Sequence, residues 1–184
     1  LRSFTVGYVP RNTSGRNVID QLADDLNTTG LYSVVRHPLY IGNFLMWLGP
    51  VLFLRSVWWV IIFILAYWLY YERIIFAEEQ YLRRKFGETY DSWAFRVKAV
   101  IPSFRRYVKS LLPFSFRNVL KREYNSIANI FVVFAFLDLC RNISVTGRFY
   151  LEPMYVSLLV AALIFWAIIR YMVKRTKFLY VEGR

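Results

Sequence analysis

The sequence has 184 residues, of which 57% are hydrophobic and 20% aromatic, and its formal net charge is +12. A nucleic-acid-binding protein of this charge would spread Lys and Arg over a polar face, but here long apolar blocks alternate with clusters of cations. This segregation argues against a nucleic-acid partner and predicts an integral membrane protein. His37 and Cys140 are the only residues of their types, so no disulfide and no zinc site are expected.

Four apolar blocks follow one another along the chain, at residues 39–54, 57–77, 127–140 and 154–173. A transmembrane helix needs roughly 20 apolar residues, and the second and fourth blocks reach that length. The first block is short, and the third contains Asp138 and needs flanking polar residues to span a bilayer. We predict an all-α fold, a polytopic membrane helix bundle of about four transmembrane helices arranged as two hairpins.

The first two blocks are separated only by Arg55 and Ser56, so we expect an antiparallel helical hairpin. The open end of this hairpin places the Arg-His-Pro segment at residues 36–38 near the Glu pair at residues 78–79. The second helix keeps good helix formers to Phe86, and Gly87 provides a C-cap.

Cations orient the predicted bundle, because eleven Lys or Arg lie between residues 80 and 124. The positive-inside rule places this long loop, the C-terminus and the Arg-His-Pro end in the cytoplasm. Residues 103–124 mix cations with Phe, Leu and Tyr, which predicts a basic interfacial segment on anionic headgroups of the bilayer. A charged linker between the two hairpins is the alternative.

The chain begins with Leu1 rather than Met, and no signal-peptide core precedes Leu31, so we expect a longer protein. We divide the sequence into an N-terminal cytoplasmic or connecting segment, a core hairpin, the basic interfacial segment, and a C-terminal transmembrane hairpin with a basic tail. These four segments cover residues 1–30, 31–102, 103–124 and 125–184.

An anion site is predicted where the first helix begins. Arg36, His37 and the adjacent backbone N–H groups meet the positive end of the helix dipole, and Pro38 suits the first helical position. Gly42 allows another group to approach the helix closely. Tyr32 and Tyr40 add aromatic rings with hydroxyls. The alternative is an interfacial helix start, with Arg36 as a headgroup anchor.

Two adjacent carboxylates, Glu78 and Glu79, are expected opposite this anion site, so the pair of motifs favours a ligand that carries both signs of charge. The alternative is a solvated helix end with a Glu79–Arg83 pair. Glu72 lies deeper and shares a helix face with Glu79, and an ionisable residue at such depth indicates function.

The sequence resembles the isoprenylcysteine carboxyl methyltransferase and phospholipid methyltransferase superfamily in two segments, "TTGLYSVVRHPLYIGNFL" and "AEEQYLRRKFGETYDSWAFRVKAVIP". The resemblance covers about residues 28–102, and the family's second Tyr corresponds to Trp93 or Phe95. The matching positions are Gly30, Tyr32, Arg36, His37, Pro38, Tyr40, Gly42, Glu78, Glu79, Leu82, Phe86, Gly87, Tyr90, Ile101 and Pro102.

The resemblance implies S-adenosylmethionine as cofactor, held at the cytoplasmic end of the hairpin. Arg36 and His37 would bind its carboxylate, and Glu78 and Glu79 its ammonium or ribose. The cofactor-binding set is Tyr32, Arg36, His37, Pro38, Tyr40, Gly42, Glu78, Glu79 and Tyr90, and the catalytic set is Arg36, His37 and Glu72.

The expected function is methyl transfer to a lipid-linked acceptor, either an isoprenylcysteine-type carboxylate or a phospholipid or other lipid headgroup. An acceptor carboxylate or phosphate needs no general base, whereas an amine would pass its proton to His37 or Glu72. Two alternatives stay open. One is an NADPH-dependent membrane reductase of the sterol reductase type, and the other is a non-catalytic lipid-binding membrane protein.

Overall fold

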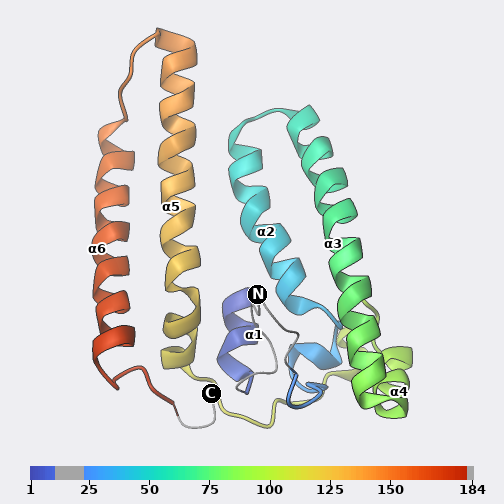
Figure 1. The fold of residues 1–184 in the computed structure, drawn as a ribbon. Coiled ribbons are helices and arrows are strands. Elements are labelled where there is room, and N and C mark those ends of the chain that lie inside the picture. Colours follow the sequence, from blue (N-terminus) through green and yellow to red (C-terminus); the bar gives the residue numbers. More distant parts are fainter. Residues whose placement is uncertain (11–22, 182–184) are drawn as a thin grey trace.

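Two helical hairpins stand side by side in the computed structural model, which describes residues 1–10 and 23–181 (Figure 1). The all-α prediction is confirmed for these ranges, because the described residues form helices and contain one isolated β-bridge but no strand. Residues 11–22 of the predicted N-terminal segment, and the last part of the predicted basic tail, lie outside the described residues.

The first hairpin consists of α2 (Pro38–Phe53) and α3 (Val57–Phe86). Residues 54–56 form the turn, in which Arg55 adopts a left-handed backbone with φ 52°. Gly87 ends α3 with φ 51°, a conformation that glycine adopts without steric cost. The predicted tight hairpin and the predicted end of its second helix are both confirmed.

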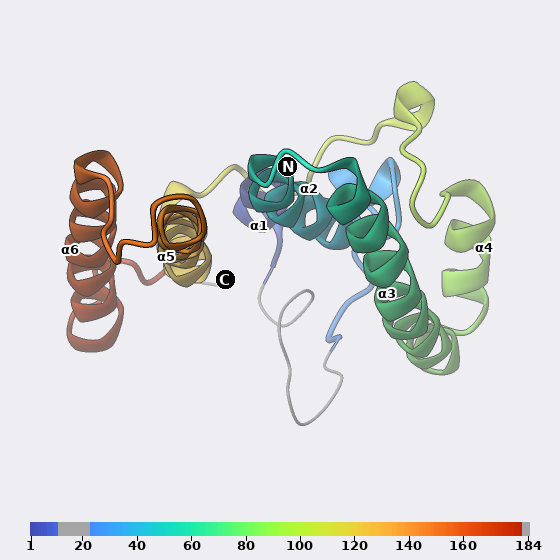
Figure 2. The same cartoon turned by 90° about the horizontal axis from the view of Figure 1, so that it is seen from above.

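The second hairpin consists of α5 (Phe116–Thr146) and α6 (Pro153–Arg175), which pack along each other (Figures 1 and 2). α5 begins well before the apolar block, because the Ser115 side chain caps it by accepting a hydrogen bond from the Asn118 backbone N–H. Residues 116–124, predicted as part of a separate interfacial segment, are therefore the first turns of this helix.

Asp138 joins the two helices of the second hairpin. Its side chain is fully buried and accepts hydrogen bonds from the Asn142 side chain and the backbone N–H of Glu152, which precedes α6. The buried carboxylate therefore satisfies a helix start that would otherwise leave N–H groups unpaired.

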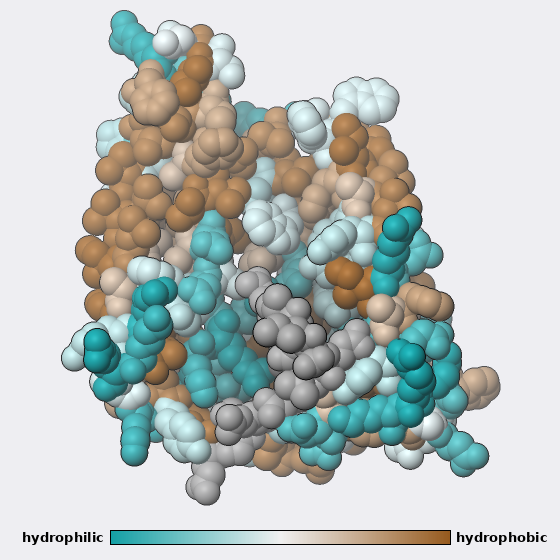
Figure 3. Space-filling model, viewed as in Figure 1, coloured by the Kyte–Doolittle hydropathy of each residue, from teal (hydrophilic) through white to brown (hydrophobic). Residues whose placement is uncertain are grey.

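Among the residues that the structure describes, three helices, α3, α5 and α6, are long and apolar enough to cross a membrane. α2 has 16 residues, so it is about 24 Å long against a hydrocarbon core of roughly 30 Å. Three of the four predicted spans thus have membrane-spanning length, and the first, α2, is a shorter apolar helix. Figure 3 shows apolar side chains over the two hairpins and polar side chains gathered at one end.

Two shorter helices lie at this polar end. α4 (Glu88–Arg96) lies beside the end of α3, and α1 (Arg2–Tyr8) lies between the hairpins, where it packs against α2 and α5 (Figures 1 and 2). From α1, Arg2 donates hydrogen bonds to Glu123 of α5 and to Asn43 of α2. α1 therefore joins the second hairpin to the first.

Candidate active site

The Arg-His-Pro segment connects a short 3₁₀ helix, η1 (Leu31–Ser33), to α2, with His37 as N-cap and Pro38 as first residue. The backbone N–H groups of Arg36 and His37 donate to the carbonyl oxygens of Lys98 and Ala99, over 2.9 and 3.2 Å. The sequence predicted an anion at the two side chains and the adjacent N–H groups of the helix start. The N–H groups of Arg36 and His37 themselves are covered by the chain that follows α4.

The side chains of the two predicted motifs meet in one polar cluster. His37 Nε2 lies 3.0 Å from Glu79 Oε1, and the Arg36 guanidinium lies 3.3 Å from the same oxygen. His37 Nδ1 lies 3.5 Å from Glu78 Oε2, which also accepts a 2.6 Å hydrogen bond from the Tyr40 hydroxyl. The tight turn at residues 54–56 thus brings together groups that are about 40 positions apart in the chain.

His37 carries a raised pKa. Burial by itself lowers the pKa of this imidazole, but hydrogen bonds and charge interactions with Glu78 and Glu79 outweigh it and raise the pKa above its ordinary value of 6.5. Both ring nitrogens face a carboxylate oxygen, so the protonated imidazolium is the form that the cluster stabilises.

This raised pKa predicts a pH-dependent stability. Because the pKa is higher in the folded state, the stabilisation by His37 is complete below the unfolded value of 6.5 and is lost as the pH rises through the folded pKa. We expect the difference in thermal unfolding temperature between the wild type and His37→Gln to be largest at slightly acidic pH and to shrink at alkaline pH. Unfolding scans in a neutral detergent would measure it. A difference that grows with pH would contradict the assigned protonation.

Two buried polar atoms adjoin the cluster without a hydrogen-bond partner among the described residues, Arg36 Nε and the Tyr90 hydroxyl. The Tyr90 side chain is fully buried, and burial together with the negative charge of Glu79 raises its pKa to about 12. Buried polar groups are rarely left unpaired, and such exceptions call for a ligand, water or strain. The Arg36 guanidinium acts on Tyr90 in the opposite direction and lowers its pKa, so the two side chains are neighbours at the edge of the cluster.

Trp93 lies beside Tyr90 in a small apolar core, and its indole N–H donates to the Tyr32 carbonyl oxygen over 3.2 Å. Phe95, the other residue that could replace the family's second Tyr, is 94% exposed. Of these two residues, Trp93 is the one that packs beside Tyr90.

An aromatic layer supports the cluster from the membrane side, and sequence analysis missed it. The Tyr67 hydroxyl donates to the Tyr40 carbonyl oxygen over 2.8 Å, and the Tyr67 and Tyr71 rings stack with centroids 4.1 Å apart. The Tyr71 ring also lies 5.0 Å from the Tyr40 ring. The signal was present, because Tyr67, Tyr71 and Glu78 recur at the spacing of one helix face.

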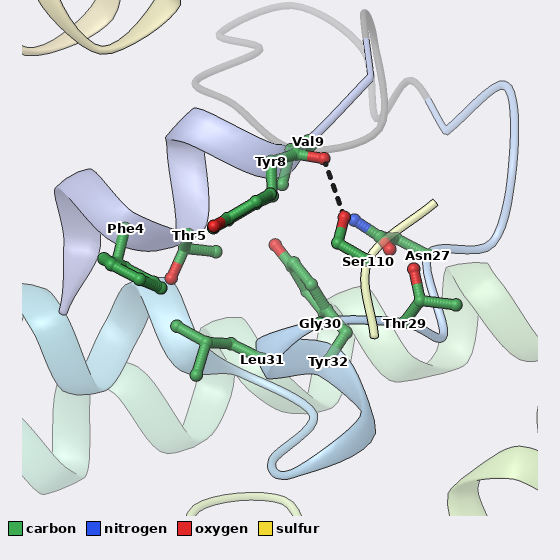
Figure 4. Close-up of a pocket in the computed structure, with 10 residues that line it drawn as sticks. All are labelled: Phe4, Thr5, Tyr8, Val9, Asn27, Thr29, Gly30, Leu31, Tyr32 and Ser110. Carbon is green, nitrogen blue, oxygen red and sulfur yellow. Dashed lines mark hydrogen bonds between the residues drawn. The ribbon is translucent and has the colours of Figure 1, made fainter. Parts of the chain in front are cut away.

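Three residues of the predicted cofactor-binding set have other surroundings. Pro38 is buried at the start of α2. Gly42 does allow a close approach, but the approaching group is Arg2 of α1, whose Cβ would lie 2.7 Å from a Cβ at this position. Tyr32 points into a pocket of about 10 Å³ beneath α1, where Ser110 donates to the Tyr8 carbonyl oxygen (Figure 4).

Glu72, predicted as a catalytic residue, is not part of the cluster. It lies on α3 with an exposed side chain and makes no hydrogen bond or ion pair with the residues that the structure describes. Helical spacing placed it on the face of Glu79, but the tyrosines that contact α2, Tyr67 and Tyr71, lie on the adjoining face of α3 that carries Glu78.

Comparison with known proteins identifies this hairpin. Residues 13–89 match the family model described as Phospholipid methyltransferase. That family consists of S-adenosylmethionine-dependent membrane methyltransferases, and residues 13–89 of this chain resemble it. The predicted resemblance is confirmed, and the match includes the whole polar cluster except Tyr90. No solved structure matches the chain significantly.

Curated relatives of this hairpin match over part of their length. Protein-S-isoprenylcysteine O-methyltransferase of Schizosaccharomyces pombe is 36% identical over 77 residues, which are 42% of this chain and 33% of that protein. Enzyme B of the same name from Arabidopsis thaliana is 37% identical over 78 residues, 42% of this chain and 39% of that protein. Nickel-cobalt-cadmium resistance protein NccN of Alcaligenes xylosoxydans xylosoxydans is 40% identical over 102 residues, which are 55% of this chain and 47% of that protein. The chain thus spans between a third and a half of these relatives.

Proposed function

We propose that this chain is an S-adenosylmethionine-dependent membrane methyltransferase that methylates a lipid-linked acceptor. The observation that carries the proposal is the cluster of Arg36, His37, Glu78 and Glu79 at the polar end of the family hairpin. Residues 31–102 form the catalytic core in this proposal, and the concentration of cations at the polar end orients it toward the cytoplasm.

The donor set of the cluster fits the cofactor. S-adenosylmethionine carries a carboxylate, an ammonium group and ribose hydroxyls, which match a guanidinium, two carboxylates and the unpaired Tyr90 hydroxyl. Arg36 would hold the cofactor carboxylate, and Glu78 and Glu79 the ammonium or the ribose. When bound, the cofactor supplies an electrophilic methyl group on its sulfonium.

The surroundings of His37 bear on the acceptor. Both of its ring nitrogens face carboxylate oxygens of Glu78 and Glu79, so neither nitrogen is free to take a proton from an amine. Glu72 is exposed and outside the cluster. The chain therefore favours an acceptor oxygen that is ionised at neutral pH, and its own residues contribute positioning and exclusion of water. A lipid-linked carboxylate, as in an isoprenylated cysteine, has this chemistry.

Two measurements on the full chain in neutral detergent test the function. S-adenosylmethionine is expected to bind and NADPH is not, as measured by calorimetric titration of each. Incubation with methyl-labelled S-adenosylmethionine, a total lipid extract and a prenylated cysteine peptide should then move label into a lipid or lipidated acceptor. Binding of NADPH alone would favour the reductase alternative. If neither cofactor bound, the non-catalytic lipid-binding alternative would be favoured.

A further inference from the structure

An open basin of about 520 Å³ lies at the polar end, outside the His37–Glu79 cluster. One wall is the segment just before the Arg-His-Pro motif, and the other is the chain from the end of α4 through the 3₁₀ helix η2 (Phe104–Arg106). Figure 2 shows α4 and η2 on the side of α3 away from the second hairpin. The polar side chains that line the basin are Ser33, Arg96, Lys98, Ser103, Arg105 and Arg106.

The two walls are held together by the backbone. Ser103 donates its N–H to the Val34 carbonyl oxygen over 3.0 Å, and Arg36 donates to Lys98 over 2.9 Å. Ser33 Oγ accepts a 2.9 Å hydrogen bond from the Val108 N–H. Both sides of the basin are therefore fixed relative to each other, although most of its side chains reach into solvent.

The charge of the basin is uncompensated. Its four cations form no ion pair with any residue in the described ranges, and residues 92–122 contain no Asp or Glu. A concave surface lined by one sign of charge concentrates counter-ions of the opposite sign. The basin therefore selects an anion, and Arg and Lys beside hydroxyls suit phosphate oxygens.

Large apolar side chains stand beside these cations. Phe95 is 94% exposed, Phe104 70% and Ile101 65%. A soluble anion would leave these side chains in water, whereas aromatic rings next to Lys and Arg are typical of the headgroup region of a bilayer. The occupant must therefore combine a phosphate with an apolar part.

We propose that the basin binds the phosphate headgroup of an anionic membrane lipid, with the lipid chains against Phe95, Ile101 and Phe104. This site shares no side chain with the methyl-transfer cluster, and it stands whether or not the chain transfers methyl groups. Its lipid also contacts the chain segment whose carbonyls hold Arg36 and His37 in place.

The test uses fluorescence anisotropy of labelled phosphatidic acid in mixed micelles of a neutral detergent with the full chain. Arg105→Gln combined with Arg106→Gln removes two cations, each worth about fivefold in affinity near a lipid surface, so binding should weaken about 30-fold. The matched control is Lys174→Gln combined with Arg175→Gln in the last turn of α6, which changes the net charge equally at the same polar end. It should weaken binding less than about twofold.

Competition identifies the ligand. Unlabelled phosphatidic acid should displace the probe, and phosphatidylcholine at the same concentration should not. Equal weakening in both double variants would mean a general charge effect, and would overturn the proposal. Displacement by inorganic phosphate as effective as by phosphatidic acid would also overturn it, because the apolar side chains would then contribute nothing. Circular dichroism verifies that both double variants keep the wild-type helix content.

Discussion

Replacing Glu79 with alanine is expected to weaken S-adenosylmethionine binding roughly 100-fold, the largest loss of affinity that we predict for a single substitution. The Glu79 carboxylate faces both the Arg36 guanidinium and His37 Nε2. Its removal leaves a partly buried guanidinium and a buried imidazole without their shared counter-charge. Hydrogen bonds to charged groups contribute about 1.5–3 kcal/mol each, and about 2.7 kcal/mol corresponds to 100-fold in Kd.

Calorimetric titration of the detergent-solubilised variants with S-adenosylmethionine measures this loss. Glu79→Gln keeps the shape and removes the charge, so it should fall between the wild type and Glu79→Ala. Glu88→Ala is the control, because Glu88 is an exposed carboxylate in the first turn of α4. A folded Glu79→Ala protein with wild-type affinity would show that Glu79 does not bind the cofactor. The methyltransferase proposal would then still be tested by the titration of the wild type.

Replacing Gly42 with alanine is expected to destabilise the protein by about 1–3 kcal/mol, the usual cost of overpacking. An added Cβ would lie 2.7 Å from Arg2 Cβ and 3.0 Å from the Arg2 backbone nitrogen. Because the Arg2 backbone nitrogen and Cα belong to the main chain of α1, the helix as a whole has to move. That movement also strains the hydrogen bonds of Arg2 to Glu123 and Asn43, which join the hairpins.

Gly49→Ala provides a control within the same helix. Beyond the adjacent backbone of α2, no atom of the described residues lies within 4 Å of a Cβ added at Gly49. The substitution is therefore expected to be neutral or to stabilise by at most about 1 kcal/mol through helix propensity. Thermal unfolding of both variants in the same detergent distinguishes the two effects. Equal shifts would show that α1 does not pack against α2 at Gly42.

Much of the first hairpin could be predicted because its determinants are local. Two apolar blocks, a turn of three residues and a glycine C-cap each depend on neighbouring residues only. The close approach of His37 to Glu79 followed directly from the tight turn. The start of α5 was harder to predict, because polar residues before an apolar block can either continue the helix or form a separate segment along the membrane surface. The Ser115 cap places the start of the helix before these residues.

The sequence by itself determined the family resemblance, the hairpin and the pair of motifs, since these depend on residue types and their spacing along one chain. Only the tertiary structure decided how each group is used. The N–H groups of Arg36 and His37 are paired with Lys98 and Ala99, and Gly42 faces Arg2. The partners in these contacts are more than 35 residues distant in sequence, so no local pattern encodes them. Packing at the end of the bundle therefore sets which atoms stay free to bind a ligand.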